Sequence, residues 1–208
     1  VETCPADEEL RDTTCKVYPG GNAKPTGILH DYGESQRMYF GLITGSQRNN
    51  LEGGVLRRNI SNFASEIDEN TGVFRSDVEG IARSIDRLRM IGGAYNDGTT
   101  DNLTRDSNWN WGAGNGNCPS IGNRAIVNGE CRMWGNPIAE MLYESLRYYA
   151  GASGATPRFA TGGSTAGNED QILGLPTPDW RNPYASAGTG LNYPSCARPY
   201  QTIISDIN

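Results

Sequence analysis

The sequence lacks the features that mark several large classes of protein. It has no run of about 18 apolar residues, so we expect no transmembrane helix. Lys and Arg number 18 against 24 Asp and Glu, and the net charge of −6 gives no electrostatic reason to bind nucleic acid. There is no Gly-x-Ser-x-Gly elbow, phosphate-binding loop or dinucleotide fingerprint. We therefore predict that the protein is not an enzyme.

Groups that could carry acid–base chemistry are also scarce. His30 is the one histidine, and no cysteine or pair of acids adjoins it, which favours a structural or surface role. The acidic pairs Glu66/Asp68 and Glu169/Asp170 lie in polar, turn-like segments, where a solvated carboxylate keeps an ordinary pKa.

The five cysteines contain no Cys-x-x-Cys pair, which removes the usual zinc spacing. Cys4 and Cys15 bracket one polar loop, and Cys118 and Cys131 bracket another. Two local disulfides in an oxidising compartment are one interpretation, and reduced thiols in a cytosolic protein are the alternative. Cys196 is left over. The chain has no initiator Met, and we expect it to be a fragment of a longer secreted protein.

The strongest helix signal runs from residue 134 to 151. Pro137 suits a first helical turn because its missing N–H would have no partner there. Apolar residues then recur at helical spacing: Ile138, Met141, Leu142, Leu146 and Tyr149. Glu140 and Glu144 fall on or near the opposite face, and Glu144 can pair with Arg147. Two further helices are predicted over 78–91 and 25–32.

The sequence predicts a strand over 37–45 and another over 53–60, joined as a hairpin by a short polar link. Residues 200–205 predict a final strand entering the interior. Arg57 and Arg58 within the second strand are either an anion site or an ordinary exposed edge.

Two long segments, at about 94–132 and 152–199, are rich in Gly, Asn, Ser and Pro and are predicted as loops. Trp109 and Trp111 lie in the first, among asparagines. They could stack on a sugar with help from amide hydrogen bonds, or they could anchor the loop.

Several stretches form an ordered set of motifs. They are Tyr18-Pro-Gly-Gly-Asn, Met38-Tyr-Phe-Gly-Leu-Ile-Thr-Gly-Ser, Gly53-Gly-Val-Leu-Arg, Gly129-Glu-Cys-Arg-Met-Trp-Gly-Asn-Pro and Ile203-Ile-Ser-Asp. Taken in order, these motifs resemble the PilY family of type IV pilus biogenesis proteins, and the resemblance covers nearly the whole chain, more weakly in the two loops.

The resemblance implies an α/β fold like that of von Willebrand factor A domains, a mostly parallel sheet flanked by helices. We expect residues 1–208 to be a single, incomplete domain of this kind, with the two loops as disulfide-stapled insertions. It also implies a Mg²⁺ or Ca²⁺ site at the strand ends, with Asn136 and Asp206 at two ligand positions. The chain departs from that pattern, because Asp-x-Ser-x-Ser is absent and Asn136 replaces a threonine.

The predicted function is a non-enzymatic module of a pilus-associated adhesin or assembly factor, located at the cell surface after passage through the periplasm. Its expected partners are minor pilins or other pilus components, host or surface ligands, and the remainder of its parent chain. The alternative is a secreted carbohydrate-binding or carbohydrate-active protein that uses the Trp109/Trp111 loop.

Overall fold

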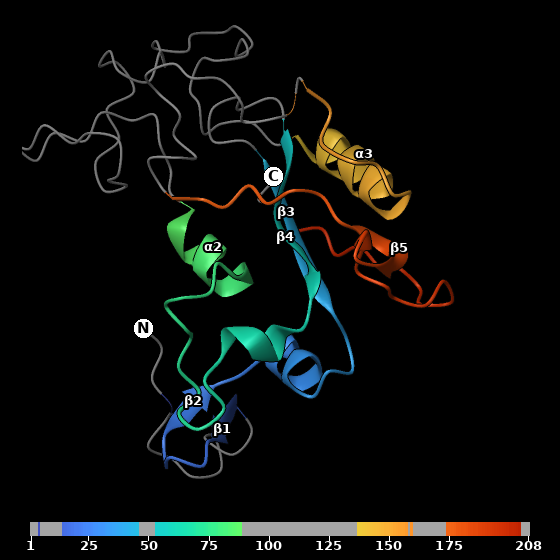
Figure 1. Ribbon diagram of the computed structural model, residues 1–208. Helices are drawn as coiled ribbons and strands as arrows, with labels where there is room; N and C mark the ends of the chain where they lie inside the picture. Colours follow the sequence, from blue (N-terminus) through green and yellow to red (C-terminus); the bar gives the residue numbers. More distant parts are fainter. Residues whose placement is uncertain are drawn as a thin grey trace, which may run out of the picture. The chain divides into compact units, whose positions relative to one another are not determined.

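The computed structural model describes residues 4, 14–45, 53–88, 137–157, 159 and 174–204, and Figure 1 labels their strands and α-helices. The elements are β1 (Cys15–Val17), β2 (Ala23–Pro25), η1 (Leu29–Glu34), β3 (Phe40–Gly45), β4 (Gly53–Ser61), η2 (Phe63–Glu66), α2 (Ile81–Arg87), α3 (Ile138–Tyr149) and β5 (Asn182–Ala187). The chain forms two compact units. The first contains Val1–Leu42 and Arg58–Asp86, and the second contains Ile43–Arg57 and Arg87–Asn208.

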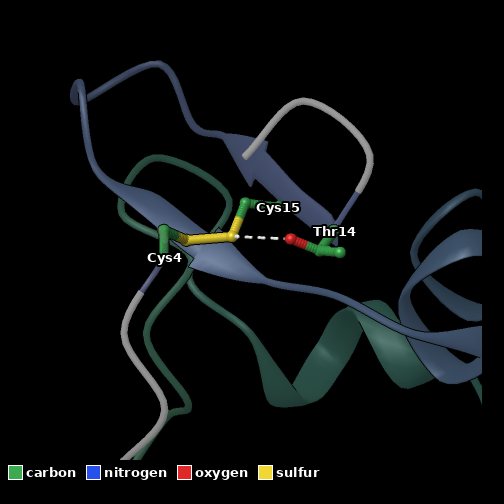
Figure 2. The surroundings of a disulfide bond; sticks show 3 residues. All are labelled: Cys4, Thr14 and Cys15. Atoms are coloured by element: carbon green, nitrogen blue, oxygen red, sulfur yellow. Dashed lines mark hydrogen bonds between the residues drawn. A yellow bond between two sulfur atoms is a disulfide. The ribbon is translucent and has the colours of Figure 1, made fainter. Parts of the chain in front are cut away.

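The first unit begins with two short paired strands and a disulfide bond. β1 and β2 pair antiparallel, with Lys16 opposite Lys24. A turn joins the two strands, in which the Tyr18 N–H donates to the Asn22 carbonyl at 2.9 Å and Gly21 adopts φ +83°. Cys4 is bonded to Cys15, and Figure 2 shows the Thr14 hydroxyl beside the Cys15 sulfur. The predicted Cys4–Cys15 disulfide is therefore present.

The core of the first unit is small and partly aromatic. Four residues are buried together: Tyr18, Phe63, Ile67 and Ile81. Leu29, Phe40 and Leu42 pack against them. Each fully buried large side chain contributes roughly 1.5–3 kcal/mol relative to exposure, so this cluster is the main apolar support of the unit.

β3 and β4 pair with each other and confirm the predicted hairpin. The seven-residue link from 46 to 52 is too short for a parallel crossover, which needs a dozen residues or more, so the strands run antiparallel. A β-carbon at Gly41 would meet the Arg58 carbonyl and Ile60, which places the start of β3 opposite the end of β4.

In the second unit, α3 begins and ends close to the predicted bounds. Gly151 follows it with φ +81°, a backbone conformation that favours glycine at a helix end. Tyr148 is buried, and its ring meets the Trp180 ring edge-on at 5.6 Å between centroids. Leu175 is also buried. β5 lies within the segment predicted as a loop, and it contacts α3.

Three predictions of secondary structure are wrong in part. Residues 200–204 form no strand, and Ile204 is 89% exposed. α2 starts three residues after the predicted 78, and Leu88 lies beyond its end. The helix predicted over 25–32 lies instead at Leu29–Glu34. The described residues combine helices with two-stranded sheets, and a von Willebrand factor A-like sheet stays a prediction.

Candidate interaction surfaces

Most residues that the sequence singled out for binding fall outside the described residues. They are Cys118, Cys131, Trp109, Trp111, Asn136 and Asp206. The disulfide, sugar-stacking and metal-site predictions that depend on them stay predictions. Within the described ranges, no three His, Cys, Asp or Glu side chains lie close enough to hold a metal ion. No helix in those ranges is long and apolar enough to cross a membrane.

Glu144 lies in the middle of α3 and is fully buried, which contradicts the predicted outer position. The predicted pairing with Arg147 is confirmed, since Arg147 Nη1 lies 2.9 Å from both carboxylate oxygens. Thr156 closes the arrangement by donating to Glu144 twice, from its N–H at 2.8 Å and its hydroxyl at 2.5 Å. These donors satisfy a carboxylate that would otherwise be costly to bury. Glu144 thus fastens the residues after α3 to the helix.

Arg57 is also fully buried, so neither predicted role, an anion site or an exposed edge, is correct for it. Its Nε donates to Thr44 Oγ1 at 2.8 Å, across the hairpin. Its Nη1 and Nη2 donate at 3.3 Å to the carbonyls of Pro176 and Gly45. The planar guanidinium reaches several acceptors at once, and it therefore links the hairpin to the segment around residue 176.

Glu66 is the buried carboxylate of the first unit, at 3% exposure, although its sequence context predicted a solvated side chain. Its Oε2 accepts from the N–H of Ala82, in the first turn of α2, at 3.3 Å. Its Oε1 has no hydrogen-bond partner and lies 3.7 Å from Arg58 Nε. The buried charges of both units are thus engaged in holding backbone segments.

One exposed apolar surface lies on the first unit and is built on three rings, which we call the aromatic face: His30, Phe63 and Phe74. His30 meets Phe63 edge-on at 5.4 Å and Phe74 at 5.8 Å between centroids. Phe63 is buried, whereas Phe74 is 46% exposed. Ile28, two residues before His30, is 69% exposed.

The environment of His30 favours its neutral form. Burial lowers the pKa of His30, and nearby Lys16 acts in the same direction, while Glu34 and Asp31 oppose the shift. Its Nδ1 accepts from the Gly27 N–H at 3.3 Å. The structural role predicted for the histidine agrees with this packing.

A second exposed apolar surface lies on α3, and we call it the α3 stripe. Its residues are Ala139, Tyr143, Leu146 and Ala150, all exposed and spaced by four, three and four positions along one side of the helix. Leu146 is 62% exposed and Tyr143 is 54% exposed. Helical spacing predicted Leu146 on the buried face, so this surface was not expected from the sequence. The signal present in the sequence is that these four positions contain no charge.

Residues 200–204 lie beside α3 without forming a strand. The Tyr149 hydroxyl donates to the Tyr200 carbonyl at 3.4 Å, and the Gln201 amide donates to the Ser145 hydroxyl. Tyr200 and Ile203 are 72% and 53% exposed. This extended segment therefore adds exposed apolar side chains near the helix.

Comparison with known proteins identifies relatives. Residues 40–208 match the family model described as "PilY1 homolog, second domain". The chain is 43% identical over 218 aligned residues to a "Type IV pilus biogenesis factor PilY1 homolog" of Xylella fastidiosa strain Temecula1. The match covers 100% of this chain and 14% of that relative. No solved structure matches the chain significantly. The chain therefore belongs to the PilY1 homolog family, and residues 40–208 correspond to the family's second domain.

Proposed function

We propose that this chain is a non-enzymatic module of a type IV pilus-associated adhesin or assembly factor, located at the cell surface after passage through the periplasm. The observation that carries the proposal is the 43% identity, over the whole chain, to a protein named as a pilus biogenesis factor. The chain spans about a seventh of that relative's length. The Cys4–Cys15 bond supports export, because such bonds persist in oxidising compartments.

The arrangement of charged and apolar groups supports binding rather than catalysis. Glu144 and Arg57 are fully buried and hydrogen-bonded to neighbouring segments, so they act as structural links. Both units expose large apolar side chains, and grouped exposure of this kind is typical of protein interaction sites. We propose minor pilins or other pilus components as the partners, and host or surface ligands as a second class.

We also propose the fold and the metal site that the family resemblance implies. A von Willebrand factor A-like sheet would be completed by residues beyond those described. Asn136 and Asp206 would then contribute oxygen ligands to Mg²⁺ or Ca²⁺. A cation site of this kind predicts that partner binding depends on divalent ions.

For the pilus partner we propose the aromatic face of the first unit. Phe74 offers a partly exposed ring held by His30 and Phe63, and a ring that is already fixed loses little freedom on binding. Phe74 also forms an isolated antiparallel bridge to Ile67, a residue of the buried core. The exposed ring is therefore supported by the buried core of the unit.

The experiment is a pull-down of the full-length polypeptide with purified minor pilins, with and without Ca²⁺ or Mg²⁺. We expect Phe74→Ser to weaken recovery by about tenfold or more, equivalent to about 1.4 kcal/mol. Val17→Ser is the matched control, since Val17 is 58% exposed in the same unit, and it should leave recovery unchanged. Ile28→Ser removes a more exposed side chain, two residues before His30, and is a second probe of this part of the unit with less effect on folding. Recovery of no pilus component under any ionic condition would count against the function itself, whereas equal effects of all three variants would count against the face.

A further inference from the structure

The buried side of α3 is not purely apolar, as it would be in an ordinary surface helix, because it contains a charged residue as well as Tyr148. The buried side carries Glu144, and the exposed side carries the uncharged α3 stripe. A helix on the surface of a complete domain normally turns its apolar side inward and its charged side outward. The orientation of α3 is nevertheless well fixed, because Glu144 is tied to Thr156 and Tyr148 packs on Trp180. Because the contacts of Glu144 and Tyr148 fix one side of the helix inward, the α3 stripe on the other side is exposed.

A further group of exposed apolar side chains lies beside the helix. The hydrogen bonds of Tyr200 and Gln201 bring the extended segment to the flank of α3 at Tyr149 and Ser145. Tyr200, Ile203 and Ile204 in this segment are all more than half exposed. The stripe and the segment together present five large exposed apolar side chains, which are Tyr143, Leu146, Tyr200, Ile203 and Ile204.

The size of this surface limits which partner could cover it. Covering all five side chains would remove on the order of 600 Å² from water, whereas a stable interface between separate proteins buries about 800 Å² per partner. A partner on the same polypeptide needs less area, because a tether of moderate length supplies an effective concentration in the millimolar range. The relative that matches this chain from end to end is several times longer, and a polypeptide of that length would carry such a tethered neighbour.

From these observations we infer that the α3 stripe and residues 200–204 form a docking surface for another domain of the same polypeptide. The neighbour would present a complementary apolar patch and would cover Leu146 and Tyr143. The inference goes beyond the proposed function, since it concerns a contact within the polypeptide and a surface other than the aromatic face.

The first test measures access to Leu146 in the full-length polypeptide. Leu146→Cys and Ser153→Cys are made separately in a Cys196→Ser background, because Cys196 is an exposed free thiol. Maleimide labelling at each site is followed by mass spectrometry in the native and the urea-unfolded protein. We expect Leu146→Cys to react at least about tenfold more slowly in the native state than in the unfolded state. Ser153 is exposed, and Ser153→Cys shows that the reagent reaches this part of the native chain. A native rate at Leu146→Cys close to its unfolded rate would overturn the inference.

The second test identifies what covers the helix. A photo-crosslinking amino acid at position 146 is introduced into an equal mixture of ¹⁴N- and ¹⁵N-labelled full-length protein. We expect crosslinks to peptides outside residues 1–208. Both crosslinked peptides should carry the same nitrogen isotope, which marks a contact within one molecule. Mixed-isotope crosslinks would show docking between copies, and crosslinks to an added minor pilin would show docking to the pilus. Either result would overturn the inference, and neither would alter the outcome of the pull-down with Phe74→Ser.

Discussion

Gly54, near the start of β4, lies against Glu144 in the middle of α3. A β-carbon built at Gly54 would come within 2.5 Å of Glu144 Cγ and within 3.0 Å of the Glu140 carbonyl oxygen. Gly54 also has φ +96°, a conformation that side-chain-bearing residues rarely adopt. This contact positions the buried side of α3 against β4 and thereby leaves the α3 stripe outward.

Replacement of Gly54 by alanine should therefore destabilise the protein. The new methyl group would meet the backbone of α3 as well as a fixed side chain, and the positive φ adds strain. We expect a loss of about 3 kcal/mol in the free energy of unfolding, measured by urea denaturation. Gly154→Ala is the control, since no atom lies within 4 Å of its β-carbon position and it should change stability by less than about 1 kcal/mol. Equal effects of the two variants would show that the contact is unimportant.

The Glu144 carboxylate should contribute strongly to stability. Glu144→Ala leaves the Thr156 N–H and the partly buried Arg147 guanidinium without their acceptor, and we expect a loss of about 3 kcal/mol. Glu144→Gln retains one oxygen and should lose less. Glu140→Ala, on the same helix and less buried, serves as the control. Urea unfolding midpoints give the comparison, and a Glu144→Ala protein as stable as the control would contradict the assigned role.

Arg57 should not be replaceable by lysine. A single ammonium group cannot reach Thr44 Oγ1 and the carbonyls of Gly45 and Pro176 from one position, so acceptors remain unpaired in the interior. We predict a loss of about 2–3 kcal/mol by thermal or urea unfolding. Arg83→Lys provides the comparison, because the surface pair of Arg83 with Glu79 is worth at most about 0.5 kcal/mol. The prediction fails if the two substitutions have similar effects.

His30 should make stability depend on pH. Burial lowers the pKa of His30 in the folded state, so the unfolded chain takes up the proton first as the pH falls. The contribution of neutral His30 is complete above the unfolded value of about 6.5 and is lost progressively as the pH falls toward the folded value. Glu34 and Asp31 oppose the shift and reduce its size.

The measurement compares urea midpoints of the native protein and His30→Gln from about pH 8 to about pH 5. Carboxylates titrate in both proteins, and His30 is the one histidine, so the difference between the two curves isolates its effect. We expect the native protein to lose more stability than the variant over this range. Parallel curves would show that the histidine does not titrate differently in the two states.

The elements that could be predicted from the sequence are those whose signals are local. The two strand signals at 37–45 and 53–60 and the short polar link between them indicated the β3–β4 hairpin, and Pro137 and Gly151 marked the ends of α3. The disulfide between Cys4 and Cys15 followed from two cysteines close in sequence. β1 and β2 were missed, because three-residue strands leave almost no periodic pattern.

The orientation of side chains depended on distant partners and could not be predicted. Sequence spacing predicts an exposed Glu144. Its burial depends on contacts with Thr156 and Gly54, which are distant in sequence or follow the helix. Arg57 likewise requires a carbonyl from Pro176, more than one hundred residues later in the chain. The apolar spacing in α3 predicted the helix but placed Leu146 on its buried side. Spacing alone cannot show that the hydrogen bonds of Glu144 determine which side is buried.

The Cys4–Cys15 bond makes the stability of the chain depend on whether its thiols are oxidised. It closes a short ring, and a crosslink over this length raises stability by about 3 kcal/mol in the chain-entropy account. That increment is missing while the thiols are reduced. In the exported protein that we propose, the reduced chain would therefore be easier to unfold for translocation, and the oxidised chain would be harder to unfold afterwards. Disulfide formation would thus oppose the unfolding that transport in the reverse direction would require.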